Sequence, residues 1–373
     1  MASWIYCLLT LTCLLFLGCA PACAEVQTEA QLKVRIVKPQ GAIRAAAVFV
    51  YYLPAGGQWI RSSPEDESGI YGPVRDLLLS RGIAVVSAQP LGLRCDGSLS
   101  ATSEGGCFDA DVTQRLGLAD WLPLLQAQVQ RARELVPSAP LVFLTFSGAT
   151  LPLSRWLETQ SATQLATVSW IGLSPLLTSP REAWRWQKQG ALLEEARAIV
   201  GTGSGADCSS DAALQFNARL RRFFPDDAAA WMTSLCQGGG LQTLESLLSQ
   251  RFDRELSQTL AASGPIQVQA PEGALMLDAR YLADVFAGTD APVRQLLRLK
   301  GRAALVYGER DIALDPHHQL SVWADSKDDS IVVLKDVGHS FGADGFASPP
   351  GAAFLSALER ALGVLAVSYA AER

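Results

Sequence analysis

The sequence predicts an α/β fold in which a mostly parallel central sheet has helices on both faces. Three observations lead to this prediction. Short apolar runs recur along the chain, at the length of strands that are buried on both faces. Segments with the apolar period of helices separate most of these runs, as in βαβ units. In residues 178–297 this alternation stops, and we expect a mainly helical insertion there.

Seven strands are expected, and the first has a different pattern from the others. Apolar and basic residues alternate in it, which is typical of a half-buried edge strand, whereas the other strands are mainly apolar. In chain order the expected strands are 32–36, 45–52, 83–88, 141–144, 166–173, 303–307 and 330–334.

A helix should begin near Val112, between the third and fourth strands. Asp111 and Gln114 have the spacing of a capping box at its start. Pro123 then lies inside the helix, where proline removes a backbone hydrogen bond, so we expect it to kink or divide the helix.

The composition fits a large globular protein and argues against two kinds of partner. Of the 373 residues, 49% are hydrophobic, which is enough for an extensive core. The formal net charge is −6, whereas a nucleic-acid-binding protein normally has a basic face, so no nucleic-acid partner is expected. The histidines do not lie near the cysteines at zinc-site spacing, and no C-x-x-C motif follows residue 24, so no metal site is predicted.

The first 24 residues have the pattern of a secretory signal peptide. Residues 4–17 are almost entirely apolar but form a short run for a membrane span. Ala22-Cys23-Ala24 has the A-x-A form of a cleavage site, with cleavage expected before Glu25. The alternative is a bacterial lipoprotein signal in which Cys19 is acylated. We therefore expect an exported protein, periplasmic or secreted, that contacts the membrane only if it is lipid-anchored at Cys19.

Four cysteines follow the signal segment, in two pairs that are close in the chain: Cys95 with Cys107, and Cys208 with Cys236. An even number of cysteines in two local pairs predicts two disulfides, formed in an oxidising compartment. The first disulfide would close a polar, glycine-rich and serine-rich loop. The second would hold the insertion together.

The segment 141–156 has the pattern of a strand, a sharp turn and a helix, with Ser147 in the turn. Such a turn lifts the serine clear of the sheet, beside the positive end of the helix, which gives a nucleophile the exposure it needs. Strand and helix approach closely there, so small residues are required at the positions of Thr145 and Ala149. Ser174, at the end of the next strand, is a rival nucleophile. Proline and not a small residue follows it, so a turn at the end of the strand is the favoured interpretation.

Two further polar residues follow later strands, Asp311 and His339. Serine is a poor nucleophile at neutral pH and requires a base, and histidine suits that role because its free pKa is near neutrality. The imidazole in turn needs a carboxylate to fix its tautomer. The carboxyl ends of parallel strands lie at one edge of a sheet, so Ser147, Asp311 and His339 could converge. Asp315 and Asp336 are alternative carboxylates, but Asp311 is favoured because it follows its strand directly.

With these residues the chain resembles the α/β-hydrolase superfamily, whose order of serine, acid and histidine it keeps. The resemblance implies that Ser147 is the nucleophile, His339 the general base and then acid, and Asp311 the orienting carboxylate. The implied organisation is a signal peptide at 1–24, an α/β-hydrolase core at 25–177 and 298–373, and a cap or lid at 178–297. The matching segments are Thr145-Phe146-Ser147-Gly148-Ala149, Gly308-Glu309-Arg310-Asp311 with Pro316, and Val337-Gly338-His339-Ser340-Phe341.

The same resemblance implies an oxyanion hole with two N–H donors. Gly148 would supply one of them, and the loop after Tyr52 would supply the other. This loop departs from the frequent His-Gly pattern and contains Pro54, which has no N–H to donate. Ala55 or Gly56 is therefore the expected second donor.

The expected activity is that of an exported serine hydrolase, which cleaves a carboxylic ester or related acyl bond through an acyl-enzyme on Ser147. This chemistry needs no metal or organic cofactor. By analogy at the level of the fold, the size of the insertion suggests a covered apolar pocket and a small-molecule or lipid-like acyl substrate. A peptidase or amidase with the same triad is one alternative. The other is a non-catalytic binding protein on this scaffold, which Thr145 and the unusual loop at 53–57 keep open.

Overall fold

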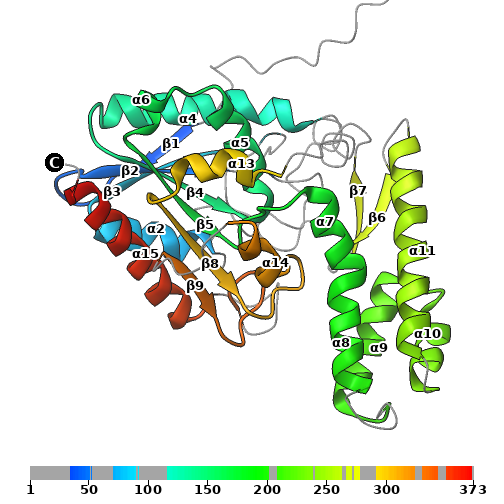
Figure 1. Ribbon diagram of the computed structural model, residues 1–373. Helices are drawn as coiled ribbons and strands as arrows, with labels where there is room; N and C mark the ends of the chain where they lie inside the picture. The colour runs from blue at the N-terminus through cyan, green and yellow to red at the C-terminus, as the bar shows by residue number, and fades with distance from the viewer. Residues whose placement is uncertain are drawn as a thin grey trace, which may run out of the picture.

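The protein is described here by a computed structural model (Figure 1). A core built on a large sheet stands beside a group of helices that extends away from it (Figure 1). The described residues are 34–50, 52, 70–89, 91, 116–200, 208–237, 240–262, 266–270, 273–277, 291–323, 330–342 and 350–371.

A seven-stranded sheet forms the centre of the core. Neighbouring strands are parallel except at one edge, where the first strand runs antiparallel to its neighbour. Each strand lies within two residues of the position that its apolar run predicts. In spatial order the strands are β1 (Val34–Val37), β3 (Ile83–Ala88), β2 (Ala45–Val50), β4 (Leu141–Phe146), β5 (Val168–Leu173), β8 (Ala303–Gly308) and β9 (Ile331–Leu334).

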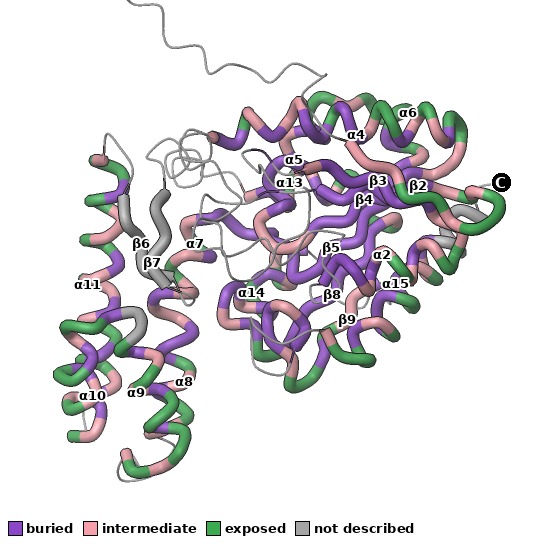
Figure 2. Tube along the Cα trace, turned by 180° about the vertical axis from the view of Figure 1, so that it is seen from behind, coloured by how far each residue is buried: buried purple, intermediate pink, exposed green. Residues whose placement is uncertain are grey.

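Helices cover both faces of this sheet, which confirms the predicted fold class. On one face lie α4 (Trp121–Leu135), α5 (Thr150–Glu158) and α13 (Val293–Leu296), and on the other lie α2 (Tyr71–Ser80) and α15 (Ala352–Ala371) (Figure 1). The central strands are buried along nearly their whole length (Figure 2). β1 is partly exposed at its edge, as its alternating pattern predicts.

The prediction that Pro123 kinks or divides a helix is wrong. A short 3₁₀ turn, η3 (Leu118–Asp120), leads into α4, which begins at Trp121, so Pro123 lies in the first turn of the helix. Proline is tolerated there because the N–H groups of a first turn have no partner within the helix. The proposed capping box at Asp111 and Gln114 lies outside the described residues.

The helices beside the core belong to the expected insertion. Residues 178–292 are called the cap segment below. The expected insertion ends at residue 297. The cap segment ends earlier because α13, which follows residue 292, packs on α5 and buries Leu296 in the core. The helices of the cap segment are α7 (Pro180–Arg185), the π-helical turn η5 (Trp186–Gly190), α8 (Ala191–Val200), α9 (Asp211–Phe223), α10 (Ala228–Cys236) and α11 (Gly240–Ala261).

Ala183 of α7 belongs to the core cluster, whereas helices α8 to α11 enclose a separate hydrophobic cluster. Phe216, Phe224 and Trp231 are its largest side chains, and each is almost fully buried. The cap segment also contains an antiparallel hairpin, β6 (Ile266–Ala270) and β7 (Gly273–Leu277), which the sequence analysis did not identify. The insertion is therefore a helical unit with a two-stranded addition.

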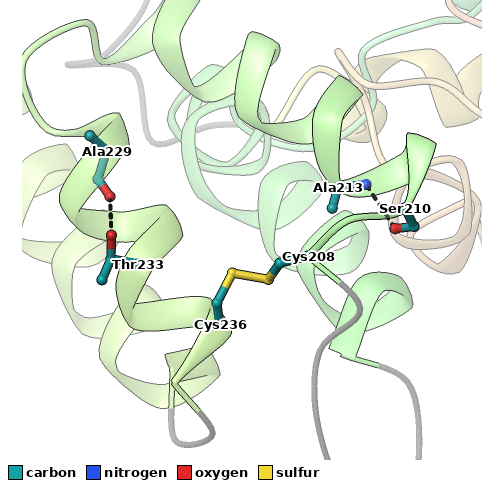
Figure 3. Close-up of a disulfide and its surroundings, with 6 residues drawn as sticks. All are labelled: Cys208, Ser210, Ala213, Ala229, Thr233 and Cys236. Carbon is teal, nitrogen blue, oxygen red and sulfur yellow. Dashed lines mark hydrogen bonds between the residues drawn. A yellow bond between two sulfur atoms is a disulfide. The ribbon is translucent and has the colours of Figure 1, made fainter.

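A disulfide between Cys208 and Cys236 joins the chain just before α9 to the last residue of α10 (Figure 3). Ser210 caps α9, since its Oγ accepts a hydrogen bond from the N–H of Ala213 at 3.2 Å. The disulfide thus fixes two neighbouring helix ends of the cap segment. Cys95 and Cys107 lie outside the described residues, as does the predicted signal segment. None of the described helices combines the length and the apolar character that crossing a bilayer requires.

Candidate active site

Ser147 lies in a strained turn between β4 and α5. The turn is η4 (Ser147–Ala149), and the φ angle of Ser147 is 54°. Left-handed backbone is uncommon and costly for residues other than glycine, and it is found where the surrounding structure enforces it. This is the backbone that a nucleophile elbow requires, because it turns the serine side chain away from the sheet. Ser147 is partly exposed, whereas the strand before it is buried.

Hydrogen bonds from two directions hold this turn. The carbonyl of Ser147 accepts from the N–H of Leu176 at 3.2 Å and from Oγ1 of Thr150 at 3.2 Å. Thr150 also donates to the carbonyl of Leu176 at 2.8 Å. The turn is therefore tied to the chain that leaves β5.

Thr145 has a role that glycine could not fill. Its Oγ1 accepts a hydrogen bond from the indole Nε1 of Trp170, on the neighbouring strand β5, at 2.9 Å, and both residues are fully buried. Gly172 leaves room for the indole, since a Cβ there would lie 2.7 Å from the ring of Trp170. The departure from glycine at this position is thus explained by a buried polar contact, which would otherwise leave the indole N–H of Trp170 without a partner. The sequence around Trp170 does not indicate this contact, which joins residues 25 positions apart.

Asp311 and His339 form a buried hydrogen-bonded pair. Oδ2 of Asp311 lies 2.7 Å from Nδ1 of His339, and the side chains are 0% and 3% exposed, respectively. Oδ1 of Asp311 accepts from the N–H groups of Ala313 and Leu314, each at 2.8 Å. A carboxylate can only accept, so Nδ1 carries the proton and Nε2 keeps the lone pair that a general base needs.

The alternative carboxylates have other partners. Asp315 is the N-cap of α14 (Pro316–Ser321), where its Oδ1 accepts from the N–H of His317 at 3.0 Å. Asp336 forms an exposed ion pair with Arg310. Asp311 is therefore the aspartate that the structure places against His339.

His339 lies beside the serine turn. Its ring packs against Phe146, the residue before Ser147, with a centroid separation of 4.9 Å. The imidazole of His339 is therefore close to the turn that carries the predicted nucleophile. Catalytic hydrogen bonds are often long before substrate binds and shorten in the Michaelis complex.

The rival serine, Ser174, is not accessible to a substrate. It is fully buried at the end of β5, and its Oγ donates to the backbone carbonyl of His339 at 3.2 Å. Close by, Tyr307 donates its hydroxyl to the carbonyl of Pro175 at 2.7 Å. Burial, together with the charge of Asp311, raises the pKa of Tyr307 well above its usual value, so this phenol stays neutral.

One of the expected oxyanion donors is described. Gly148 follows Ser147 in the turn, and a Cβ on it would lie 3.5 Å from the ring of Tyr52. Tyr52 immediately precedes the loop in which the second donor is expected. Ala55 and Gly56 lie outside the described residues. No group of three or more metal-binding side chains occurs within the described part of the chain.

No family model matches this sequence, and no curated protein does. Solved structures are similar in part. Est1E from Butyrivibrio proteoclasticus with bound ferulic acid has 14% identity and a TM-score of 0.46, over 90% of this chain and 95% of that one. A monoacylglycerol lipase from Paleococcus ferrophilus has 13% identity and a TM-score of 0.43, over 90% and 99%. A proline iminopeptidase from Mycobacterium smegmatis has 12% identity and a TM-score of 0.44, over 91% and 96%.

Three features of the chain itself define its fold. The sheet is parallel except for its edge strand β1. A serine with left-handed backbone follows the central strand β4, and an aspartate and a histidine that bind each other follow β8 and β9. With the serine, the acid and the histidine in this chain order, the protein has the α/β-hydrolase fold.

Proposed function

We propose that the protein is an exported serine hydrolase that cleaves a carboxylic ester or related acyl bond through an acyl-enzyme on Ser147. The observation that carries the proposal is the buried contact of 2.7 Å between Asp311 and His339, next to the strained turn of Ser147. A buried carboxylate and imidazole beside a partly exposed serine are the groups that nucleophilic acyl transfer requires.

In the first half of the reaction, Nε2 of His339 takes the proton of Ser147 as Oγ attacks the acyl carbonyl. Asp311 holds the ring in the correct tautomer and stabilises the imidazolium that forms. The N–H of Gly148, with that of Ala55 or Gly56, donates to the oxyanion of the tetrahedral intermediate. The intermediate then collapses, and the leaving alcohol takes the proton from His339.

In the second half, His339 removes a proton from water, which attacks the acyl carbonyl. The bond from the carbonyl carbon to Oγ of Ser147 then breaks, His339 returns the proton to Oγ, and the carboxylic acid leaves. Every step uses groups of the protein and water, so this mechanism needs no metal or organic cofactor. The cap segment stands beside the core (Figure 1). By analogy at the level of the fold, we propose that the enzyme acts on a small-molecule or lipid-like acyl substrate. The same triad also serves peptidases and amidases, which differ in how they recognise the leaving group.

A non-catalytic binding protein is the second candidate, and the unusual sequence of the loop at 53–57 keeps it open. Thr145 no longer supports this candidate, since its contact with Trp170 accounts for it.

Export is part of the proposal. The pattern of residues 1–24 supports it, and so does the disulfide between Cys208 and Cys236, because disulfides persist mainly in oxidising compartments. A lipid anchor at Cys19 is the alternative route to the same compartment.

Labelling with a fluorophosphonate tests the proposal. The oxidised protein, recovered from the periplasm or medium, should gain a single adduct that maps to Ser147, and its intact mass should correspond to a chain that begins at Glu25. Ser147→Ala should give no adduct and should unfold at nearly the same temperature as the wild type. Ser154→Ala, which removes a buried hydroxyl inside α5, is the matched control and should be labelled normally.

An ester, thioester and amide panel would then distinguish esterase from amidase chemistry. If the wild type gains no adduct under conditions that label a known serine hydrolase, the binding-protein candidate is correct instead. If the recovered chain instead begins at a lipid-modified Cys19, the protein is exported but anchored to the membrane.

A further inference from the structure

The chain that leaves β5 contacts both sides of the predicted triad. We call residues 174–178 the junction, and all of them are buried. As described above, the junction donates to the carbonyl of Ser147 through the N–H of Leu176, and to the carbonyl of His339 through Oγ of Ser174. It therefore connects the nucleophile turn to the loop that carries the base.

The junction is also fixed to the side of the sheet that carries Asp311. The N–H of Ser174 donates to the carbonyl of Val306 in β8 at 2.7 Å. Oε1 of Gln319, a buried residue of α14, accepts from the N–H groups of Leu177 and Thr178 at 2.6 and 3.0 Å. Nε2 of Gln319 donates to Oγ1 of Thr178 at 2.8 Å. With these bonds the junction has little freedom to move relative to residues 308–314, the acid turn, which carries Asp311.

Ser174 is the strained residue of the junction. Its φ angle is 39°, in the left-handed region, although it has a side chain. Such a conformation is unfavourable for a residue with a side chain and persists only where the surroundings enforce it. Here it directs a fully buried hydroxyl at the end of β5 toward a carbonyl in the loop that carries His339, 165 residues later in the chain.

The carbonyl that Ser174 binds belongs to His339 itself, so the bond restrains the backbone from which the imidazole extends. The same loop has a second strained residue, Phe341, with a φ angle of 63°, and closes on itself through the N–H of Gly338 and the carbonyl of Gly342 at 3.1 Å. A loop of this shape needs an external contact to fix its distance from the serine turn. Ser174 supplies one next to the residue whose position matters.

We propose that Ser174 is a positioning residue, which holds His339 at the place where its ring meets both Asp311 and Ser147. Ser174 touches no reacting atom in this proposal and acts through the backbone of His339. The part that concerns turnover rests on the proposed hydrolase function, whereas the part that concerns the imidazole does not.

The test that needs no activity uses the small number of histidines in the chain. Protein labelled with ¹⁵N-histidine should give ring signals from three residues, His317, His318 and His339. The Nδ1–H of His339 is buried against Asp311, so it should be protected from exchange, and His339→Gln assigns it by its loss. In Ser174→Ala this signal should shift and exchange faster with water. The signals of His317 and His318, in α14, serve as internal references.

Ser174→Gly is the second variant, because it removes the hydroxyl but adopts a positive φ angle without strain. It should fold even if Ser174→Ala does not, and it should change the His339 signal in the same way. Ser154→Ala is the matched control. Its hydroxyl is also buried and donates to a backbone carbonyl, that of Leu151 at 2.8 Å, and its loss should leave the His339 signal unchanged.

The kinetic test uses an ester that the wild type hydrolyses. Both Ser174 variants should lower kcat about tenfold with little change in KM, because a displaced base slows proton transfer more than it weakens binding. An unchanged Nδ1–H signal in both variants would overturn the proposal, even if the melting temperature falls, since that pattern is purely structural. A wild type without turnover would refute the hydrolase function alone, and the histidine spectra would still decide the role of Ser174.

Discussion

The core and the cap segment are stabilised by different interactions. In the core, paired strands present continuous apolar faces, and the Asp311–His339 pair is buried at the ends of strands. In the cap segment, amphipathic helices enclose a smaller cluster and are joined by a disulfide and by ion pairs, such as that between Arg219 and Glu195 at 2.6 Å. The precise geometry of the site thus depends on strand pairing, whereas the shape of the cap segment depends on a few local connections.

One contact between the two regions lies at the acid turn. Gln187, in the π-helical turn η5, donates through Nε2 to the carbonyl of Ala313 at 3.2 Å. The N–H of the same Ala313 binds Asp311. A change in the cap segment can therefore reach the carboxylate of the triad. The experiments below distinguish a cap segment that is coupled to the core from one that is independent of it.

The largest effect is expected from a change in the core. Asp311→Asn should lower kcat by about 10⁴-fold, since an amide nitrogen cannot accept the Nδ1 proton and leaves the imidazole in the wrong tautomer. The fold should survive, because Oδ1 of asparagine can still accept from Ala313 and Leu314. Steady-state kinetics and circular dichroism measure the two effects. Asp315→Asn and Asp336→Asn are the matched controls, and a comparable loss in either would assign the carboxylate to that residue instead.

A smaller effect, confined to the other region, is expected from removal of the disulfide. Replacing both Cys208 and Cys236 by serine should destabilise the cap segment by roughly 3 to 4 kcal/mol, the chain-entropy value for a loop of this length. Hydrogen exchange should accelerate in α9 and α10 and stay slow in β4 and β5. If hydrogen exchange accelerates equally in β4 and β5, the two regions form one cooperative unit and the comparison above is wrong.

The smallest effect concerns a buried lysine of the cap segment. Lys188 lies 3.3 Å from Glu255 and is almost fully buried, and this burial lowers its pKa from the usual 10.5 although Glu255 opposes the shift. Between the lowered pKa and 10.5 the unfolded chain binds more protons than the folded one, so the free energy of unfolding should rise with pH in that interval.

The slope should be at most about 1.4 kcal/mol per pH unit and should disappear in Lys188→Met. Denaturant unfolding followed by tryptophan fluorescence at several alkaline pH values measures it. Lys335→Met, at an exposed position in the core, should keep the slope. A slope that is the same in wild type and Lys188→Met would show that other groups cause it.

The sequence predicted the core better than the cap segment, for a physical reason. Strands of a parallel sheet are buried on both faces and therefore form apolar runs, which locate them directly. In the hairpin, apolar and polar residues alternate in Ile266–Ala270 but not in Gly273–Leu277, so its strand signal is weak and lies among helical segments. Pro123 was misread because its effect depends on where the helix begins, and the composition does not fix that position.

The candidate site could be predicted in its residues but not in all its contacts. The places of Ser147, Asp311 and His339 after their strands are enough to bring them to one edge of the sheet. The bonds of Thr145 with Trp170, and of Ser174 with His339, join residues that are far apart in the chain, so no local pattern indicates them.

The cap segment leaves and rejoins the core at a single hydrogen-bonded place. The N–H of Val293 donates to the carbonyl of Leu177 at 3.2 Å, so the two ends of the segment are adjacent. Evolution can therefore lengthen, shorten or exchange the chain between these residues without changing the order of the strands in the sheet. A family of such proteins would be expected to diversify in this stretch, with the chemistry inherited and the choice of substrate acquired by insertion.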